Sequence, residues 1–233
     1  MSIMSYNVEA IGYLRLERPS KKYQLPRQPE SSEPACIELL PGKNFEQALE
    51  GLEQFSHLWI LFWMHEVTGY KPKVRAPGIE KKLGLFATRS PHRPNPIGLS
   101  CVKLIKVESR KIWIEGADIL DGTPILDVKP YLAHKEAFSQ AKMGWIEKRI
   151  EAKIEWETGL YQKLELLAVE DPYLNPLALE RRLRLDPLPS YYNRLKIDGN
   201  QFEMASGRWR FKGTFHFNEE KIPFFLIQSV VSA

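Results

Sequence analysis

The first 135 residues alternate short runs of β-forming residues with turns and loops that are rich in proline and glycine. The runs cover residues 8–17, 36–40, 56–67, 83–87, 97–108, 111–120 and 124–132. Several short strands at regular spacing, with turn residues between them, are typical of a sandwich or barrel of β-strands. This pattern therefore predicts an all-β sandwich or barrel over roughly residues 1–135.

The run "SHLWILFWMHEV" (56–67) is apolar at alternate positions of both parities. A strand with this composition is predicted to be buried on both faces. His57 and His65 are eight residues apart, so on one extended strand their side chains share a face. We expect His57 to be a core histidine held by hydrogen bonds. His65 and Glu66 end the strand, where side chains reach a site.

The composition changes after residue 135. Residues 136–150 are polar, and "EAKIEWE" (151–157) predicts one more strand. Helical spacing and helix-opening residues follow over 160–167 and 175–185, and three strands are predicted over 194–199, 208–217 and 223–231. We therefore predict a β-domain over 1–155 and a smaller α+β domain over 156–233.

Positive charge is unevenly distributed along a chain whose net charge is +4. Between Lys71 and Arg93 there are seven lysines and arginines against one acid, Glu80. A second cluster comprises Arg181, Arg182 and Arg184. Each cluster fits either a solvated surface or the binding of a polyanion such as nucleic acid.

Several classes of protein are excluded by missing motifs. The sequence contains no G-x-G, no phosphate-binding P-loop, no G-x-S-x-G and no H-E-x-x-H, and its five histidines have no spacing that suits zinc. Only Cys36 and Cys101 are present, which makes a secreted disulfide framework improbable. The first residues lack a signal-peptide pattern, and the longest apolar run, 58–64, is too short for a membrane. We expect a soluble, cytoplasmic protein without a metal.

The loop "ATRSPHRPNPIGLS" (87–100) is the strongest functional signal. Pro91, Pro94 and Pro96 fix their own backbone and restrict the residues before them, so the loop is ordered before any ligand arrives. Arg89 and Arg93 have the geometry to bind a carboxylate or phosphate, and Asn95 lies between two prolines. The alternative is a stiff connection between strands.

Three other segments combine turn residues with polar groups. In "ILDGTPILDVKPYL" (119–132), Gly122 is expected to take a positive φ in a tight turn, and Asp121 is a candidate contact for an adenine or ribose. "LPRQP" (25–29) places Arg27 and Gln28 between prolines. "DPLPSYY" (186–192) offers Tyr191 or Tyr192 for stacking on an unpaired base. A hairpin turn and a stiff linker are the structural alternatives.

These motifs, with "GLEQFSHLWILFWMHE", occur in the order typical of the TsaA-like family, which residues 1–135 resemble. The tail resembles the "DPRPAY" element of the family's bacterial tRNA (N6-threonylcarbamoyladenosine) methyltransferases, with Leu188 and Ser190 replacing an arginine and an alanine. The resemblance implies a small antiparallel β-barrel that binds S-adenosyl-L-methionine without a Rossmann fold. It also implies a homodimer with the cofactor close to the subunit interface. The substrate it implies is the anticodon loop of threonine tRNA, methylated on N6 of threonylcarbamoyladenosine.

By resemblance, the cofactor-binding positions are Pro26, Arg27, Gln28, His65, Glu66, Arg89, Leu99, Leu120, Asp121, Gly122 and Thr123. The acceptor nitrogen is a poor nucleophile and needs a group that takes its proton. Candidate bases are His65, Asp121 and Asp186. Candidate substrate contacts are Arg93, Asn95 and Tyr191, with the C-terminal domain contacting tRNA. A non-catalytic module that senses S-adenosylmethionine, and an RNA-binding barrel without a cofactor, remain as alternatives.

Overall fold

The computed structural model describes residues 6–17, 34–148, 150–171, 174–189, 194–206 and 208–232. The chain forms two compact units: a barrel unit, Met1–Lys71 with Pro91–Gln140, and a C-terminal unit, Pro72–Ser90 with Ala141–Ala233. Residues 72–90 and 141–155 thus group with the C-terminal unit, although the sequence suggested a division at 155. A functional division at 155 stays a prediction.

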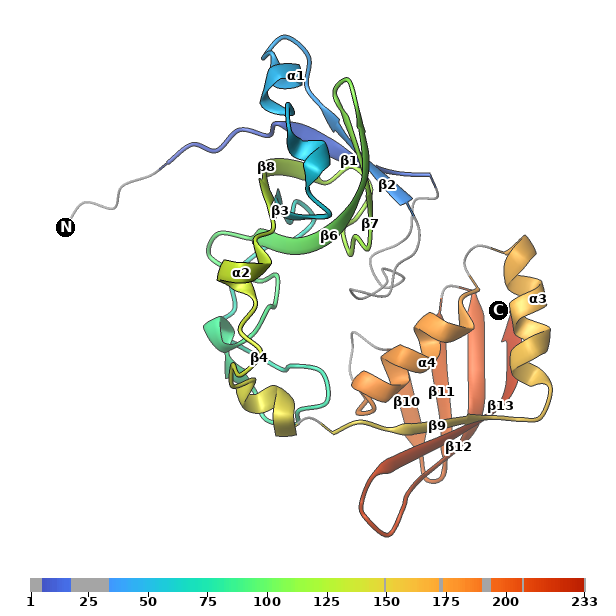
Figure 1. The fold of residues 1–233 in the computed structure, drawn as a ribbon. Coiled ribbons are helices and arrows are strands. Elements are labelled where there is room, and N and C mark those ends of the chain that lie inside the picture. Colours follow the sequence, from blue (N-terminus) through green and yellow to red (C-terminus); the bar gives the residue numbers. More distant parts are fainter. Residues whose placement is uncertain are drawn as a thin grey trace. The chain divides into compact units, whose positions relative to one another are not determined.

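Six strands form a closed barrel in the first unit (Figure 1). They are β1 (Gly12–Leu16), β2 (Pro34–Leu39), β3 (His57–Trp63), β6 (Ile97–Glu108), β7 (Lys111–Glu115) and β8 (Pro124–Pro130). Their order around the barrel is β1-β2-β7-β6-β3-β8, and every neighbouring pair is antiparallel. The prediction of a small antiparallel β-barrel is confirmed.

Alternate side chains of each strand fill the barrel. On β3, Leu58, Ile60 and Phe62 are buried, whereas Trp59, Leu61 and Trp63 are only half-buried. The expectation that this strand is buried on both faces was therefore wrong. A single-layer barrel has one packed interior, so the second apolar face of β3 lies on the outside.

The helices of the barrel unit are short. They are α1 (Phe45–Ala48), a 3-10 helix over Leu52–Gln54 and α2 (Ala133–Glu136). Asn44, which begins α1, has a φ of 55° and makes no capping bond to the backbone. Its side-chain amide instead donates to Oε1 of Gln47 at 2.7 Å.

The ring of Phe62 lies directly over Gly98. The two residues are paired between β3 and β6, and a Cβ at position 98 would lie 2.2 Å from Cζ of Phe62. Glycine is thus required here because an aromatic ring covers the backbone, which fills the end of the barrel where β6 begins.

The C-terminal unit is a five-stranded sheet with helices on one face (Figure 1). The strands are β9 (Lys153–Trp156), β10 (Leu195–Asp198), β11 (Gln201–Ser206), β12 (Trp209–Phe217) and β13 (Pro223–Ser232), ordered β10-β11-β12-β13-β9. The helices α3 (Leu160–Glu170) and α4 (Pro176–Leu185) pack Leu164, Leu179 and Leu183 against Phe211 and Phe225. The α+β architecture is as predicted, but β11 was not anticipated from the sequence.

Residues 72–90, called the 72–90 segment below, form a small hairpin within the C-terminal unit. Its strands are β4 (Lys73–Val74) and β5 (Leu83–Gly84), and a 3-10 helix over Leu85–Ala87 follows. A second 3-10 helix covers Gly144–Lys148. No helix in the described part of the chain is long and apolar enough to cross a membrane.

The contact between Gly98 and Phe62 predicts a large effect of a small substitution. Gly98→Ala should destabilise the barrel by about 1–3 kcal/mol, because the added methyl displaces the Phe62 ring from a packed interior. Urea unfolding followed by circular dichroism measures this. Gly84→Ala is the matched control, because a Cβ there meets nothing within 4 Å and the φ of Gly84 is −58°. Equal stability of the two variants would contradict the packing argument.

Candidate functional site

One end of the barrel collects the motifs that the sequence singles out. Because the strands are antiparallel, β1, β3 and β7 end where β2, β6 and β8 begin. We call this end the motif rim. It carries His65 and Glu66 after β3, residues 91–96 before β6, and the turn 120–123 before β8.

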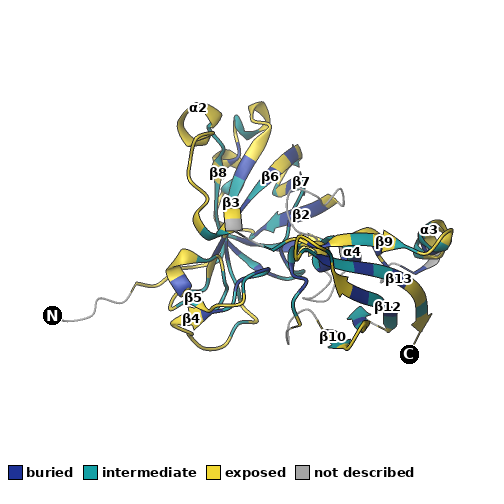
Figure 2. Cartoon of the chain, turned by 90° about the horizontal axis from the view of Figure 1, so that it is seen from below, coloured by how far each residue is buried: buried dark blue, intermediate teal, exposed yellow. Residues whose placement is uncertain are grey.

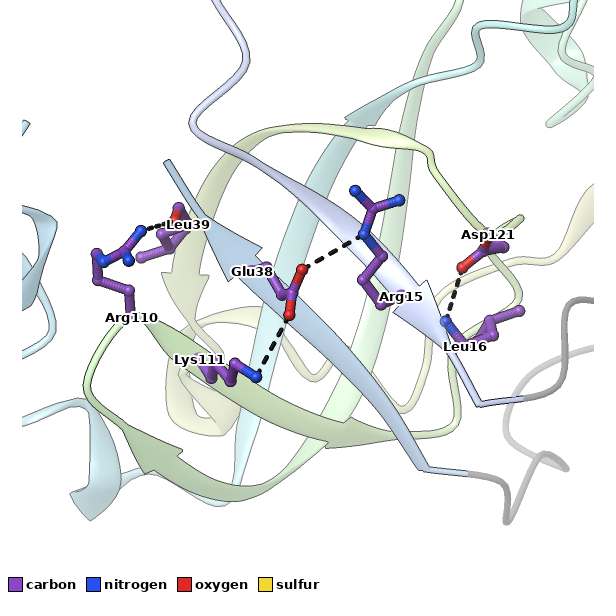
Figure 3. Close-up of polar contacts among 7 residues, drawn as sticks. All are labelled: Arg15, Leu16, Glu38, Leu39, Arg110, Lys111 and Asp121. Atoms are coloured by element: carbon purple, nitrogen blue, oxygen red, sulfur yellow. Dashed lines mark hydrogen bonds and ion pairs between the residues drawn. The ribbon is translucent and has the colours of Figure 1, made fainter. Parts of the chain in front are cut away.

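The turn 120–123 is built into the seam between β1 and β8. Gly122 has a φ of 71°, as predicted, and donates its N–H to the carbonyl of Leu14 at 2.8 Å. Leu14 donates to the carbonyl of Thr123 at 3.0 Å. Oδ1 of Asp121 accepts the N–H of Leu16 at 2.8 Å (Figure 3). Asp121 therefore holds the last residue of β1 in place, a role that the sequence did not reveal.

His65 and Glu66 lie in a turn directly after β3. The strand ends at Trp63, and His65 donates its N–H to the Trp63 carbonyl at 2.8 Å. His57 and His65 are consequently not on one extended strand, and His57 is exposed rather than a core residue. The side chains of His65 and Glu66 are exposed, and the His65 ring makes no hydrogen bond with the described residues. A turn, rather than a continuing strand, presents both groups to solvent.

The loop before β6 is tied to its neighbours by backbone hydrogen bonds. The carbonyl of Pro96 accepts the N–H of Met64 at 2.8 Å, and the carbonyl of His92 accepts the N–H of Lys71 at 3.2 Å. Within the loop, Arg93 donates to the Pro91 carbonyl at 2.7 Å. These bonds support a loop that is ordered without a ligand. Arg93 is half-buried and Asn95 is exposed.

The outer face of the barrel next to this loop is apolar. Leu99 is 52% exposed and Ile97 is 40% exposed, and they pair with Leu61 and Trp63 of β3. On the inner face, the buried Ser100 donates its hydroxyl to Asp118, which lies just before the turn 120–123. The start of β6 thus combines an exposed apolar surface with a hydrogen-bonded polar interior.

The two cysteines are poor candidates for nucleophilic chemistry. Burial raises the pKa of both Cys36 and Cys101, and nearby carboxylates, Glu38 and Glu136 respectively, raise it further. Both thiols are therefore protonated at neutral pH and are poor nucleophiles. Among the described residues, no group of three or more His, Cys, Asp or Glu side chains is arranged to hold a metal ion.

Asp186 anchors the 72–90 segment within the C-terminal unit. Its carboxylate is buried and accepts hydrogen bonds from Nη2 of Arg75 at 3.2 Å and from the N–H of Gly78 at 3.3 Å. Arg75 also donates to the carbonyl of Leu188 at 3.4 Å. Leu188, which replaces the arginine of the family's tail motif, thus binds Arg75 through its backbone carbonyl. Sequence reasoning missed Arg75, because its partner is 111 residues away and no spacing signals the pair.

The two basic clusters have different environments. In α4, Arg182 donates to the Ala205 carbonyl at 3.1 Å and Arg184 pairs with Glu180, so both bind within the unit. In the 72–90 segment, Lys73, Lys81, Lys82 and Arg89 are exposed and form no ion pair with the described residues. Of the two clusters, the 72–90 segment is therefore the one whose exposed basic side chains form no ion pair within the described part of the chain.

Some candidate residues lie outside the described residues. These are Pro26, Arg27, Gln28 and Tyr191. In the sequence, Pro26, Arg27 and Gln28 lie between Leu16, which ends β1, and Pro34, which begins β2.

Residues 18–137 match the family of the tRNA-methyltransferase O N-terminal domain. The chain belongs to this family. The resemblance to the TsaA-like barrel proteins is thereby confirmed, and it rests on more than half of the chain.

Two relatives of the tRNA-methyltransferase O family illustrate how far the likeness extends. A putative S-adenosylmethionine-dependent methyltransferase, RcsF, of Pseudomonas aeruginosa is 46% identical over 60% of this chain and 63% of its own length. The tRNA (adenine(37)-N6)-methyltransferase of Escherichia coli is 37% identical over 80% of this chain and 84% of its own length. The chain spans about three fifths of the length of the Pseudomonas relatives that it matches.

A solved structure extends the family likeness to the whole fold. The crystal structure of TrmO from Pseudomonas aeruginosa superposes with a TM-score of 0.63 at 30% identity, and the match covers 100% of this chain and 99% of that one. The C-terminal unit is therefore part of the shared architecture.

The contacts of Asp186 predict a measurable loss of stability. Asp186→Ala should cost about 1.5–3 kcal/mol, since the Arg75 guanidinium and the Gly78 N–H lose a charged acceptor. Removing both charges, with Arg75→Leu and Asp186→Leu together, should cost less than the sum of the single changes. Urea unfolding measures both, and tryptic cleavage at Lys81 and Lys82 reports on the segment itself. Lys103→Ala, which removes an exposed pair with Glu115, is the control. A cost of Asp186→Ala no greater than that of the control would refute the anchor.

Proposed function

We propose that the protein is an S-adenosylmethionine-dependent methyltransferase that acts on N6 of adenosine 37 in tRNA, next to the anticodon. More specifically, the proposed substrate is threonylcarbamoyladenosine in threonine tRNA. The gathering of His65, Glu66, the 91–96 loop and the 120–123 turn at the motif rim is the observation that carries this proposal. Membership of the family and the names of the relatives support it.

The described residues of the motif rim fit an adenosine-bearing cofactor. When bound, S-adenosylmethionine supplies a methyl group on a positively charged sulfur. The exposed Leu99 offers apolar surface, and hydrogen bonds to Leu14 hold the turn from Leu120 to Thr123 in a fixed geometry. By family resemblance, Glu66 is a further contact. By the same resemblance, Arg89 in the C-terminal unit is also a cofactor position, and a guanidinium suits a carboxylate.

The contacts of the three candidate bases favour His65 as the group that takes the proton from N6. Asp121 uses its carboxylate to hold Leu16, and Asp186 is ion-paired with Arg75. Protonation of either carboxylate would weaken a contact on which the local fold depends. The ring of His65 has no hydrogen bond to lose among the described residues. His65 is also within the set that the family resemblance assigns to the cofactor.

Arg93 and Asn95 are the proposed substrate contacts of the loop. The threonyl group of the modified adenosine carries a carboxylate, for which a guanidinium is a strong partner. Main-chain hydrogen bonds on both sides of Arg93 limit its movement. Correct placement of reacting groups is the main source of rate in a displacement of this kind.

We also propose that the chain acts as a cytoplasmic homodimer. The exposed Leu99 and Ile97, next to Leu61 and Trp63, form an apolar surface suited to a second copy. Sedimentation equilibrium of the intact chain tests this, and a monomer at micromolar concentration would argue against it.

The proposed reaction is tested by mass. The protein is incubated with S-adenosylmethionine and tRNA from cells that lack the modification, and the digested nucleosides are analysed. The gain of one methyl group on threonylcarbamoyladenosine is expected. Cofactor binding without transfer would favour a sensing module, and RNA binding without cofactor binding would favour an RNA-binding barrel.

Variants at Arg93 and His65 should affect different steps. Arg93→Ala should raise KM for tRNA while leaving cofactor binding nearly unchanged, because its partner is on the substrate. His65→Ala should lower the single-turnover rate at saturating cofactor and tRNA by about 10²-fold or more, as expected for loss of a general base. Isothermal titration with the cofactor and quench-flow kinetics measure the two effects. Equal loss of cofactor binding in Arg93→Ala would contradict the first role, and an unchanged rate in His65→Ala would contradict the second.

A further inference from the structure

Phe86 is an exposed aromatic residue on a fixed backbone. Its side chain is 75% exposed, whereas Leu85 beside it is buried. Leu85 donates its N–H to the Pro72 carbonyl at 3.0 Å, and the carbonyl of Ala87 accepts the indole N–H of Trp145 at 2.7 Å. The backbone on both sides of Phe86 is therefore held in place, while most of its side chain is exposed.

Three exposed lysines lie in the same segment as Phe86. Lys73 on β4 is paired with Gly84 on β5, two residues before Phe86, and Lys81 and Lys82 directly precede β5. All three lysines are exposed and have no ion pair with the described residues. Figure 2, coloured by burial, shows exposed residues in the chain at β4 and β5, although Val74 is buried. The only acid between Pro72 and Ser90 is Glu80.

The C-terminal unit fixes the whole segment at three places. Asp186 binds Arg75 and the N–H of Gly78, the carbonyl of Gly78 accepts the N–H of Ile150 at 3.1 Å, and Trp145 binds Ala87. A solvated surface hairpin does not require a buried ion pair and an indole hydrogen bond. These anchors hold the backbone of the segment in one arrangement.

We propose that the 72–90 segment binds unpaired nucleotides of RNA, with Phe86 as a stacking platform for one base and the three lysines as phosphate contacts. Aromatic rings interspersed with cations are how proteins bind single strands without reading a sequence. This inference rests on the proposed function, and it assigns to this segment a contact with the tRNA substrate.

The charge of the segment favours RNA over a second copy of the chain as its partner. Lysine is depleted in the cores of protein–protein interfaces. Here three unpaired lysines lie within the same short hairpin as the exposed ring. A surface of this composition matches the phosphates and bases of a single strand.

Binding of a labelled RNA hairpin with an unpaired loop tests the role of Phe86 by fluorescence anisotropy. Phe86→Ala should weaken binding about tenfold or more, as expected for loss of a stacked base. Phe86→Trp should restore it, and a fully paired RNA should be insensitive to both changes. Phe138→Ala, at a phenylalanine that is 74% exposed in the barrel unit, is the matched control and should have no effect.

Salt dependence tests the lysines. The double change Lys81→Ala with Lys82→Ala should reduce the slope of log affinity against log salt by roughly 1.4, about 0.7 for each lost phosphate contact. Lys163→Ala, an exposed lysine on α3, is the control. An unchanged slope, or equal affinity of Phe86→Ala and Phe138→Ala, would overturn the proposal. Loss of self-association in Phe86→Ala with intact RNA binding would also overturn it and indicate a protein interface.

The methyl-transfer assay on the unaltered protein separates this inference from the proposed function. Methyl transfer with normal RNA binding by Phe86→Ala would refute the stacking role alone. RNA binding that depends on Phe86, without methyl transfer by the unaltered protein, would refute the enzyme while leaving the RNA surface in place.

Discussion

The pairing of β1 with β8 is the interaction on which the arrangement of the rim depends. It closes the barrel through Gly12 and Ile125, and hydrogen bonds between Leu14 and the turn continue the ladder beyond the strands. On its other side Gly12 pairs with β2, where a Cβ would lie 2.3 Å from the carbonyl oxygen of Glu38, so glycine is needed between these two strands. The turn assigned to ligand binding is thus the same element that closes the barrel, so its geometry is set by the fold.

The structure also gives the two acidic candidates, Asp121 and Asp186, a structural role. The sequence offers Asp121 and Asp186, together with His65, as candidate bases. In the structure each carboxylate joins segments that are distant in sequence: Asp121 joins the turn to β1, and Asp186 joins the tail to the 72–90 segment. An aspartate whose carboxylate has no partner can take a proton. An aspartate that accepts hydrogen bonds from backbone or guanidinium N–H groups instead stabilises the fold. By contrast, the turn at the end of β3 leaves the ring of His65 exposed, which is why we propose His65 as the base.

The sequence was informative wherever the signal was local. Runs of β-forming residues between turns located the barrel strands, and the "DGT" turn gave the positive φ of Gly122. Errors arose where tertiary context decided the outcome. The end of β3 at Trp63 and the half-buried outer face of that strand follow from barrel closure, which a single strand does not encode. The partnership of Arg75 with Asp186 joins residues 111 positions apart, and no periodic pattern reports such a contact.

The anchor between Arg75 and Asp186 also bears on the order in which the chain acquires its structure during synthesis. Arg75 leaves the ribosome 111 residues before its partner. At about 5–20 residues per second, this interval lasts roughly 5–20 s. The strands that follow the 72–90 segment directly, β6 to β8, are synthesised in that time, and the buried acceptor Asp186 comes later. A hairpin encoded in the middle of the barrel sequence therefore gains its anchor only after every barrel strand has been made.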